Sequence, residues 1–200
     1  MPRGPPSANP NAFIAALPDA PGLDASLIKG NVPQDQKRLS ANALAFFVDS
    51  QGKSYNAGVG KRIKLVEINT RKRRGEAGKE TDEMETVCEI VVEPDMCNVY
   101  GVLHGGCAAY IIDPCTSSAL VGLGLYLGVD GTGMSNSMQI IWHAAAPLGA
   151  KLRIVNTSLS IKGRVRSARC EIWNTRTGEL CISGVHSTVN ASKKLPSAKL

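Results

Sequence analysis

The chain has 200 residues, of which 43% are hydrophobic and 20% are charged, and this size and composition suit one folded domain with one core. No stretch approaches the roughly 18 consecutive apolar residues that a membrane-spanning helix needs, so we expect no membrane span. The formal net charge of +6 favours an anionic partner, such as a nucleic acid, a lipid surface or a multiply phosphorylated cofactor.

Residues 1–36 are predicted to be a flexible, disordered arm. They hold seven of the eleven prolines among Ser, Asn, Ala and Gly, which interrupts regular pairing and leaves little to bury. A helix is predicted from about Gln36 to Val48, because its apolar residues recur at helical spacing. We therefore divide the chain into an arm (1–36), a helical lead-in (37–57), a main domain (58–191) and a tail (192–200).

Two strands are predicted at the start of the main domain, where apolar residues stand among charged ones. These residues are Ile63, Leu65, Ile68, Val87, Ile90 and Val92. Residues 71–80 between the strands, RKRRGEAGKE, are predicted to form a polar loop. Such a basic run is typical of a solvated hairpin tip, and also of a nuclear address or a phosphate site, so we give it no role in the site.

A long, largely buried helix is predicted from about His104 to Leu127, where Ala, Leu, Ile and Gly occur without strand-like alternation. Pro114 lies inside this helix and removes one backbone donor. We therefore expect a kink or a break near Tyr110 to Asp113.

Four strand-like segments follow a Gly-rich turn. They are Met134 to His143, Lys151 to Ile161, Arg164 to Trp173 and Leu180 to Val189. In the third, apolar residues at 168, 170 and 172 alternate with 169, 171 and 173, which predicts one covered and one wetter face. Two strands, a long helix and four strands indicate an α+β domain with a mainly antiparallel sheet against a central helix.

The six cysteines and three histidines do not have the spacing of a metal site. No Cys-x-x-Cys pair occurs, and the histidines His104, His143 and His186 stand far apart, so no metal is expected. A chain of this length without a secretory h-region favours reduced, mostly buried thiols over a disulfide framework.

The start of the long helix carries candidate chemistry. Gly105 and Gly106 let a ligand approach the backbone, and the first amides of a helix lack intrahelical partners and carry the positive end of its dipole. These amides suit the oxyanion of a thioester, although the glycines equally allow tight helix-to-sheet packing. Asp113 on this apolar helix is costly to bury unless it is partnered or used in catalysis; the alternative is a structural cap or hydrogen bond.

Helix geometry separates these groups within one chain. Asp113 lies seven residues beyond Gly106, on nearly the same face but about 10 Å further along the axis. A two-fold dimer with antiparallel helices brings Asp113 of one chain toward the Gly105 and Gly106 amides of the other, with Asn98 close by. We therefore expect a homodimer with two shared sites.

Together these residues resemble a known signature. Asn98, Gly101, the His104-Gly105-Gly106 triplet and Asp113 are similar to the signature of the PaaI-like hotdog thioesterases, and the resemblance spans residues 58–189 without the arm. It implies an α+β hotdog fold, a homodimer or dimer of dimers, and hydrolysis of acyl-CoA thioesters without a metal or redox cofactor.

The resemblance also implies residue roles. Asp113 matches the carboxylate that acts as general base or nucleophile, and Gly105 or Gly106 matches the amide that polarises the carbonyl. Asn98 matches a side chain that helps to hold the water or the thioester. Ser135 matches a hydroxyl that orients water, and His104 is a structural residue of the loop.

Similar proteins hold the nucleotide end of CoA at a strand-to-strand turn, which here contains Lys162, Gly163, Arg164 and Arg166. Arg, Lys and backbone donors bind phosphate, while a charged tight turn without a ligand is the alternative. The sequence departs from the family pattern at Pro114 and in the long 71–80 loop.

Two rival functions share the fold. An enoyl-CoA hydratase of this fold pairs its Asp with a His five residues on, and this chain has Ser118 there. A non-catalytic acyl-CoA sensor is the alternative from another functional class. No helix-turn-helix or RNA-binding signature is present, so no nucleic acid is expected.

The last three residues, Ala198-Lys199-Leu200, are a close variant of the Ser-Lys-Leu peroxisomal signal. They predict a peroxisomal import receptor as a partner and the peroxisome as the location, with the cytoplasm as the alternative.

Overall fold

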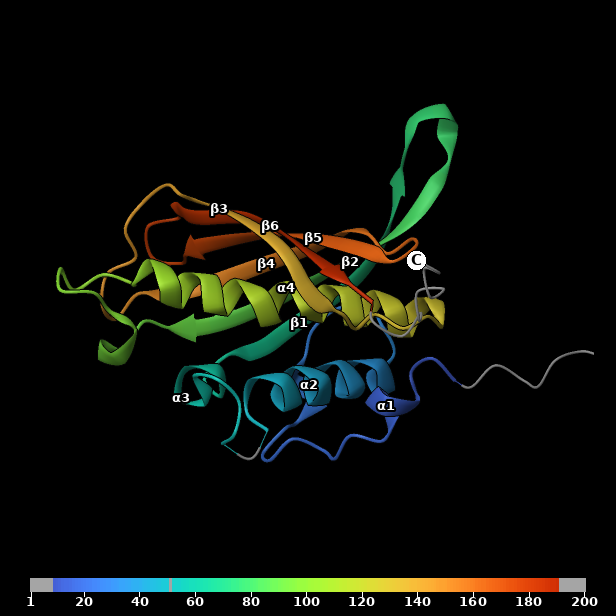
Figure 1. The fold of residues 1–200 in the computed structure, drawn as a ribbon, viewed down its shortest axis with the longest axis horizontal. Helices are drawn as coiled ribbons and strands as arrows, with labels where there is room; N and C mark the ends of the chain where they lie inside the picture. The colour runs from blue at the N-terminus through green and yellow to red at the C-terminus, as the bar shows by residue number, and fades with distance from the viewer. Residues whose placement is uncertain (1–8, 51, 191–200) are drawn as a thin grey trace, which may run out of the picture.

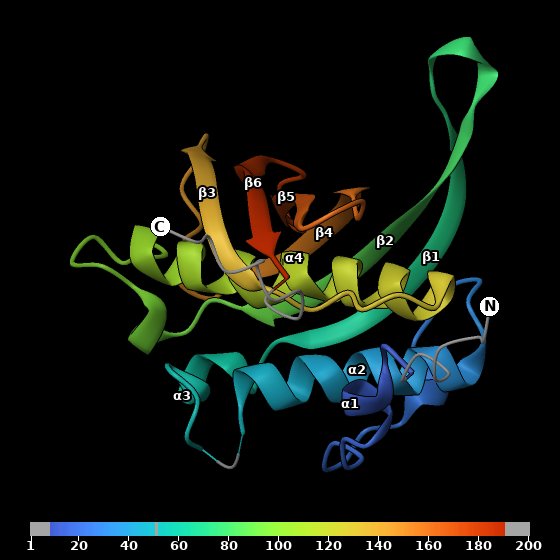
Figure 2. The ribbon, with the colours of Figure 1, turned by 45° about the vertical axis from the view of Figure 1, so that its right-hand side comes forward.

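The computed structural model describes residues 9–50 and 52–190. Its elements in chain order are α1 (Ala12–Ala15), η1 (Ala25–Leu27), α2 (Gln34–Val48), α3 (Ala57–Gly60), β1 (Lys64–Arg74), η2 (Glu76–Gly78), β2 (Glu80–Val91), η3 (Pro94–Met96), α4 (Gly105–Leu127), β3 (Met134–Trp142), β4 (Lys151–Ser160), β5 (Val165–Asn174) and β6 (Leu180–Val189). Figures 1 and 2 show three layers: the sheet, the long helix α4 against it, and α2 on the other side of α4. The predicted α+β architecture is confirmed.

The sheet has six strands in the order β1-β2-β4-β5-β6-β3, and every neighbouring pair is antiparallel. The four C-terminal strands begin and end within two residues of their predicted bounds. In β5, Ala168, Cys170 and Ile172 are fully buried as predicted, because alternate residues of a strand face the core. This order leaves β3 at one edge, where it pairs with β6 alone among the strands of the described residues.

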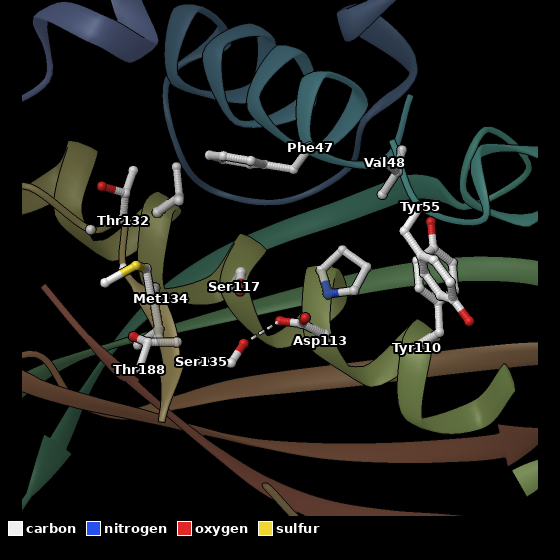
Figure 3. Close-up of a pocket in the computed structure, with 15 residues that line it drawn as sticks. Phe47, Val48, Tyr55, Tyr110, Asp113, Ser117, Thr132, Met134, Ser135 and Thr188 are labelled. Atoms are coloured by element: carbon white, nitrogen blue, oxygen red, sulfur yellow. Dashed lines mark hydrogen bonds between the residues drawn. The ribbon is translucent and has the colours of Figure 1, made fainter. Parts of the chain in front are cut away.

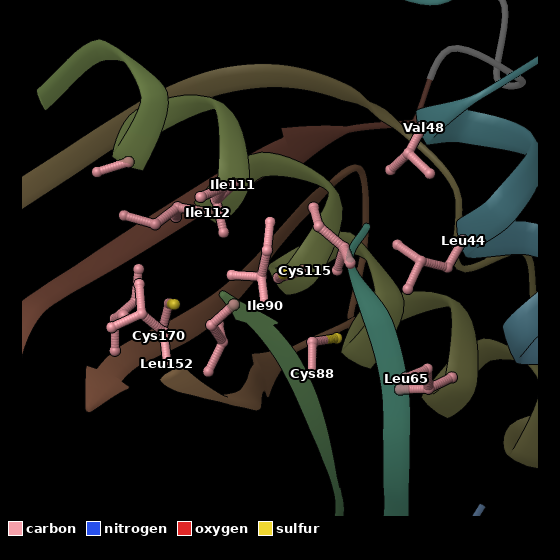
Figure 4. Close-up of a cluster of buried hydrophobic side chains, with 14 of the residues drawn as sticks. Leu44, Val48, Leu65, Cys88, Ile90, Ile111, Ile112, Cys115, Leu152 and Cys170 are labelled. Carbon is pink, nitrogen blue, oxygen red and sulfur yellow. The ribbon is translucent and has the colours of Figure 1, made fainter. Parts of the chain in front are cut away.

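Helix α4 is the centre of the core. It begins after His104, whose side chain caps it, and ends at Gly128 with a left-handed φ of 67°. Ile111, Ile112 and Cys115 are fully buried against the sheet and α2 (Figure 4). The helix has the length and apolarity of a membrane span, but 67% of its most apolar window is buried in the domain, as in the core helix of a globular protein.

A kink or a break was predicted near Tyr110 to Asp113; the break does not occur, since α4 continues through Pro114 to Leu127. Proline removes only the one amide that would bond the carbonyl four residues earlier. The buried residues on either side of it pack on the sheet and hold the helix in place, so Asp113 keeps a helical position.

The predicted flexible arm is wrong for residues 9–36. Ile14 and Leu17 pack with Ala43 and Val121 in a small apolar cluster. The backbone of Lys29 bonds to β1, donating to the Val66 carbonyl at 2.9 Å and accepting from the Ile68 amide at 3.0 Å. Scattered apolar residues between the prolines therefore anchor the segment, and α2 already begins at Gln34. Residues 1–8 lie outside the described part.

The predicted loop 71–80 is mostly strand. β1 and β2 extend into a ribbon that leaves the sheet (Figures 1 and 2), with a turn at residues 75–79. The register places Arg71 opposite Glu83 and Lys72 opposite Asp82, and both pairs form ion pairs. The basic run is thus matched by acidic residues of the facing strand, which stabilises a ribbon that has no core of its own.

All six cysteines are free: Cys88, Cys97, Cys107, Cys115, Cys170 and Cys181. Four of them are buried, as predicted.

Candidate active site

Asp113 lines a cavity of about 440 Å³ between α4, the end of α2 and the start of β3 (Figure 3). Its side chain is 49% exposed. Ser135 enters the same cavity from β3, and Phe47 and Val48 enter it from α2. The structure brings the predicted residues Asp113 and Ser135 together, and the hydroxyl of Ser135 donates to Asp113 Oδ1 at 3.2 Å.

A chain of hydrogen bonds runs behind Ser135 into the core. His186 Nε2 lies 3.1 Å from Ser135 Oγ and 3.7 Å from Asp113 Oδ1. His186 Nδ1 lies 2.7 Å from Thr116 Oγ1 on α4. The His186 side chain is fully buried. Neither His186 nor Thr116 was predicted to be a member of the site.

The Thr116 hydroxyl donates its one proton to the Ile112 carbonyl at 2.7 Å, so its oxygen accepts from Nδ1–H of His186. In the neutral imidazole Nε2 is then an acceptor, and the Ser135 hydroxyl lies within hydrogen-bond distance of both Nε2 and Asp113 Oδ1. Burial lowers the pKa of His186, against the opposing effect of Asp113, and so favours this neutral form. These hydrogen bonds therefore hold Oδ1 of Asp113 and leave Oδ2 facing the cavity.

Replacing His186 with Gln is expected to make the protein less sensitive to acid. Below about pH 6.5, the ordinary pKa of histidine, the unfolded chain binds a proton at this position that the folded chain resists. The free energy of unfolding therefore falls as the pH drops from 6.5 toward the lowered pKa. Urea unfolding at pH 7.5 and pH 5.5 measures this loss, which is smaller in His186→Gln. An equal loss in the variant and the wild type contradicts this role, and the exposed His143→Gln is the matched control.

A second cavity of about 400 Å³ lies at the N-terminal end of α4. Gly105 and Asn98 line it, together with Trp142 and His143 at the end of β3. Asn98 Oδ1 accepts from the amides of Tyr100 at 3.0 Å and Val102 at 3.4 Å. These bonds orient the side chain, and its Nδ2 has no partner among residues 9–50 and 52–190, so it is available to a ligand.

The two glycine amides at the start of α4 are not equivalent. The Gly106 amide donates to His104 Nδ1 at 2.9 Å, and the His104 amide donates to the Met96 carbonyl at 2.8 Å. His104 is therefore a helix cap, consistent with its expected structural role. The Gly105 amide has no acceptor in the described part of the chain, which makes it the better oxyanion donor of the two.

Cysteines on α4 are poor competitors for the role of Asp113. Burial raises the pKa of Cys107 to about 11. A hydrogen bond with Cys88, together with burial, raises the pKa of Cys115 well above its ordinary value. Both thiols therefore stay protonated at neutral pH, where a thiolate is needed for nucleophilic attack.

The residues of the predicted CoA-binding turn differ in their exposure to solvent. Lys162, Gly163 and Arg164 are exposed between β4 and β5. Arg166 is only 6% exposed and donates to the Thr132 carbonyl, and burial lowers its pKa. The expectation that Arg166 binds a phosphate is therefore corrected: its guanidinium supports the loop that leads into β3.

Within residues 9–50 and 52–190 no residue lines both cavities, so this part of one chain does not bring Asp113 and Gly105 to a common space. The two cavities lie at opposite ends of β3, with Ser135 at the start of the strand and Trp142 at its end. The free edge of β3 carries exposed apolar residues, among them Met134 at 65%, Ile141 at 52% and Trp142 at 54%. An open apolar edge strand of this kind is a template for pairing with another chain.

Three known proteins are similar to this chain. Acyl-coenzyme A thioesterase 13 of Homo sapiens is 29% identical over 103 residues, which cover 52% of this chain and 71% of that protein. The crystal structure of zebrafish thioesterase superfamily member 2 matches with a TM-score of 0.56 and 22% identity, over 74% of this chain and 96% of that one. A hypothetical thioesterase from Streptococcus pneumoniae, solved with coenzyme A, matches with a TM-score of 0.52 and 18% identity, over 67% and 90%.

The structural matches establish the hotdog fold that the sequence predicted. A search against descriptions of known protein families finds no match. The predicted C-terminal signal, residues 198–200, lies outside the described residues.

Proposed function

We propose that this chain, which is a PaaI-like thioesterase of the hotdog fold, hydrolyses acyl-CoA thioesters to the free acid and CoA at a site centred on Asp113. The observation that carries the proposal is the hydrogen-bonded chain from Thr116 through His186 and Ser135 to Asp113, which ends at a cavity. A carboxylate held on one oxygen by a serine is positioned to use its other oxygen on a water molecule.

The reaction requires few groups. Asp113 Oδ2 takes a proton from water as the water oxygen bonds to the thioester carbonyl carbon. The negative charge that develops on the carbonyl oxygen is stabilised by the Gly105 amide and Asn98 Nδ2. The C–S bond then breaks, and the CoA thiolate leaves and takes the proton from Asp113. Direct attack by Asp113, through an anhydride that water opens, uses the same oxygen.

We propose that the two groups of catalytic residues come from different protomers: Asp113 and Ser135 from one, and Asn98 and Gly105 from the other. Two copies of β3 that pair antiparallel around Met138 place Met134 of one chain opposite Trp142 of the other. The cavity of Asp113 and Ser135 then meets the partner's cavity of Asn98 and Gly105. Two features support a second copy as the partner: the open apolar edge of β3, and the separation of the two cavities at its opposite ends.

CoA carries several phosphate charges, and the exposed turn of Lys162 and Arg164 offers it two cations. Arg164 also accepts from the Asn190 amide through its carbonyl, which ties the turn to the end of β6 at 3.0 Å. The basic net charge of the chain suits the same polyanionic substrate.

Mixing two inactive variants tests the shared site. Asp113→Asn chains and Gly105→Ala chains are refolded together in equal amounts. Random pairing makes about half of the dimers mixed, and each mixed dimer has one site free of both changes, so activity returns to about a quarter of the wild-type value. A site contained in one chain gives no recovery.

The control pairs Asp113→Asn with a chain that carries both changes. No site in that mixture is intact under either arrangement, so it stays inactive. A non-catalytic sensor, the alternative function, predicts acyl-CoA binding by the wild type without hydrolysis at any enzyme concentration.

A further inference from the structure

The cavity beside Asp113 continues along α4 as a groove. Asp113, Ser117, Leu120 and Val121 all line it, and their spacing of four, seven and eight residues places them on one face of the helix. Phe47 of α2 covers this face opposite Ser117 (Figure 3). The site therefore has an apolar extension that leads away from the carboxylate toward the C-terminal half of α4.

The groove is closed at its far end by a glycine loop. A Cβ atom at Gly131 would lie 2.3 Å from the Leu120 carbonyl oxygen and 2.7 Å from the Val121 Cα. The loop backbone thus packs directly on α4, with no space for a chain between them. Leu120 and Val121 are buried at this end, whereas Phe47 and Tyr55, which line other parts of the cavity, are 43% and 83% exposed.

The distance from the carboxylate to this closed end sets a length. Eight helical residues from Asp113 to Val121 span about 12 Å. An extended alkyl chain with bonds of about 1.5 Å at about 111° advances roughly 1.3 Å per carbon, so the groove accommodates roughly nine carbons beyond the reacting carbonyl. The walls are mostly apolar along this path, with Ser117, Thr132 and Thr188 as the small polar exceptions.

We propose that this groove binds the acyl chain and selects straight medium-length acyl groups of about eight to ten carbons, with Ser117 as the residue that keeps it open. This inference rests on the proposed function, because it assigns the acyl end of the same substrate. Ser117 is half-buried, and no hydrogen bond of its side chain is found in the described part of the chain. Its small size is the property that matters, since a larger side chain at this point fills the groove about 6 Å beyond Asp113.

The test compares Ser117→Phe with Ser117→Ala on CoA esters of 4, 8, 10, 12 and 16 carbons. In the wild type, kcat/KM rises with length to 8–10 carbons and rises no further. Ser117→Phe lowers kcat/KM for the 10-carbon ester at least about tenfold relative to the 4-carbon ester, because several methylenes lose their apolar contacts. Ser117→Ala keeps the wild-type profile.

Binding of a non-hydrolysable decyl-CoA thioether gives a second readout, and Ser117→Phe weakens it by a similar factor. If all esters are affected equally in Ser117→Phe, or if wild-type kcat/KM is independent of length, the groove assignment is overturned while hydrolysis at Asp113 stands. If the wild type hydrolyses no ester, the proposed function itself fails. Retained activity on the 4-carbon ester shows that Ser117→Phe is folded, and Ser117→Leu replaces it if it is not.

Discussion

Asp113→Asn is expected to lower kcat for acyl-CoA hydrolysis by a hundredfold or more, since loss of a positioned general base costs roughly 10²–10⁴. Asn has nearly the same shape and still accepts the hydrogen bond from Ser135, so the helix, the cavity and the His186 chain remain in place. The KM therefore changes little, and the effect appears in kcat. Steady-state hydrolysis of a medium-chain acyl-CoA measures both constants.

Asp35→Asn is the matched control, because Asp35 is an exposed carboxylate on α2 that forms an ion pair with Arg38 far along the chain from the site. The Asp35→Asn substitution is expected to leave kcat unchanged. Wild-type turnover in Asp113→Asn, with folding confirmed by circular dichroism, removes Asp113 from the mechanism and leaves the cavity as a binding site only.

Most of the fold could be predicted from the sequence, because periodicity and glycine positions are local features. The helix from Gly105 to Leu127 and the strands after it follow from periodicity, and the glycine pair marks the helix start. The break expected near Tyr110 to Asp113 does not occur, because tertiary packing of the buried neighbours outweighs the one backbone donor lost at Pro114.

The members of the site that escaped prediction depend on strand register. His186 lies 70 residues from Thr116 and 51 from Ser135, and nothing local connects them. Its position in β6 did carry a signal, because it alternates in phase with the buried residues 182, 184 and 188. Arg166 stands in the same phase as the buried residues of β5, which argues against a phosphate ligand at that position.

The sequence could not predict that α2 forms one wall of the Asp113 cavity. Phe47 and Val48 read as the apolar face of a helix, but only the packing of α2 on α4 shows that they face Asp113. The N-terminal arm was mispredicted for a related reason. The proline content argues against regular strand pairing, but the side chains of Ile14 and Leu17 are buried although they belong to no strand.

Gly105→Ala is expected to raise stability and lower activity at the same time. Alanine has a higher helix propensity than glycine, and at the first residue of α4 its gain is smaller than the roughly 0.5–1 kcal/mol found in a helix interior. The new methyl group fits in the free chain, because its nearest neighbour is the Trp142 ring at an ordinary contact distance of 3.5 Å. The same methyl occupies the space through which a thioester carbonyl reaches the Gly105 amide, so kcat/KM falls by roughly 10²–10³, the cost of losing one oxyanion donor.

Thermal unfolding and steady-state kinetics on the same preparation separate these effects. Gly58→Ala is the control for a glycine in an exposed helical position with open space around it, and it leaves kcat/KM unchanged. Gly106→Ala is the contrasting variant, because its methyl lies 3.2 Å from His104 Nδ1 and disturbs the cap. A Gly105→Ala protein that is more stable and fully active places the oxyanion elsewhere. A Gly105→Ala protein that is more stable and inactive shows that Gly105 lowers the stability of the helix but leaves its amide accessible to the substrate.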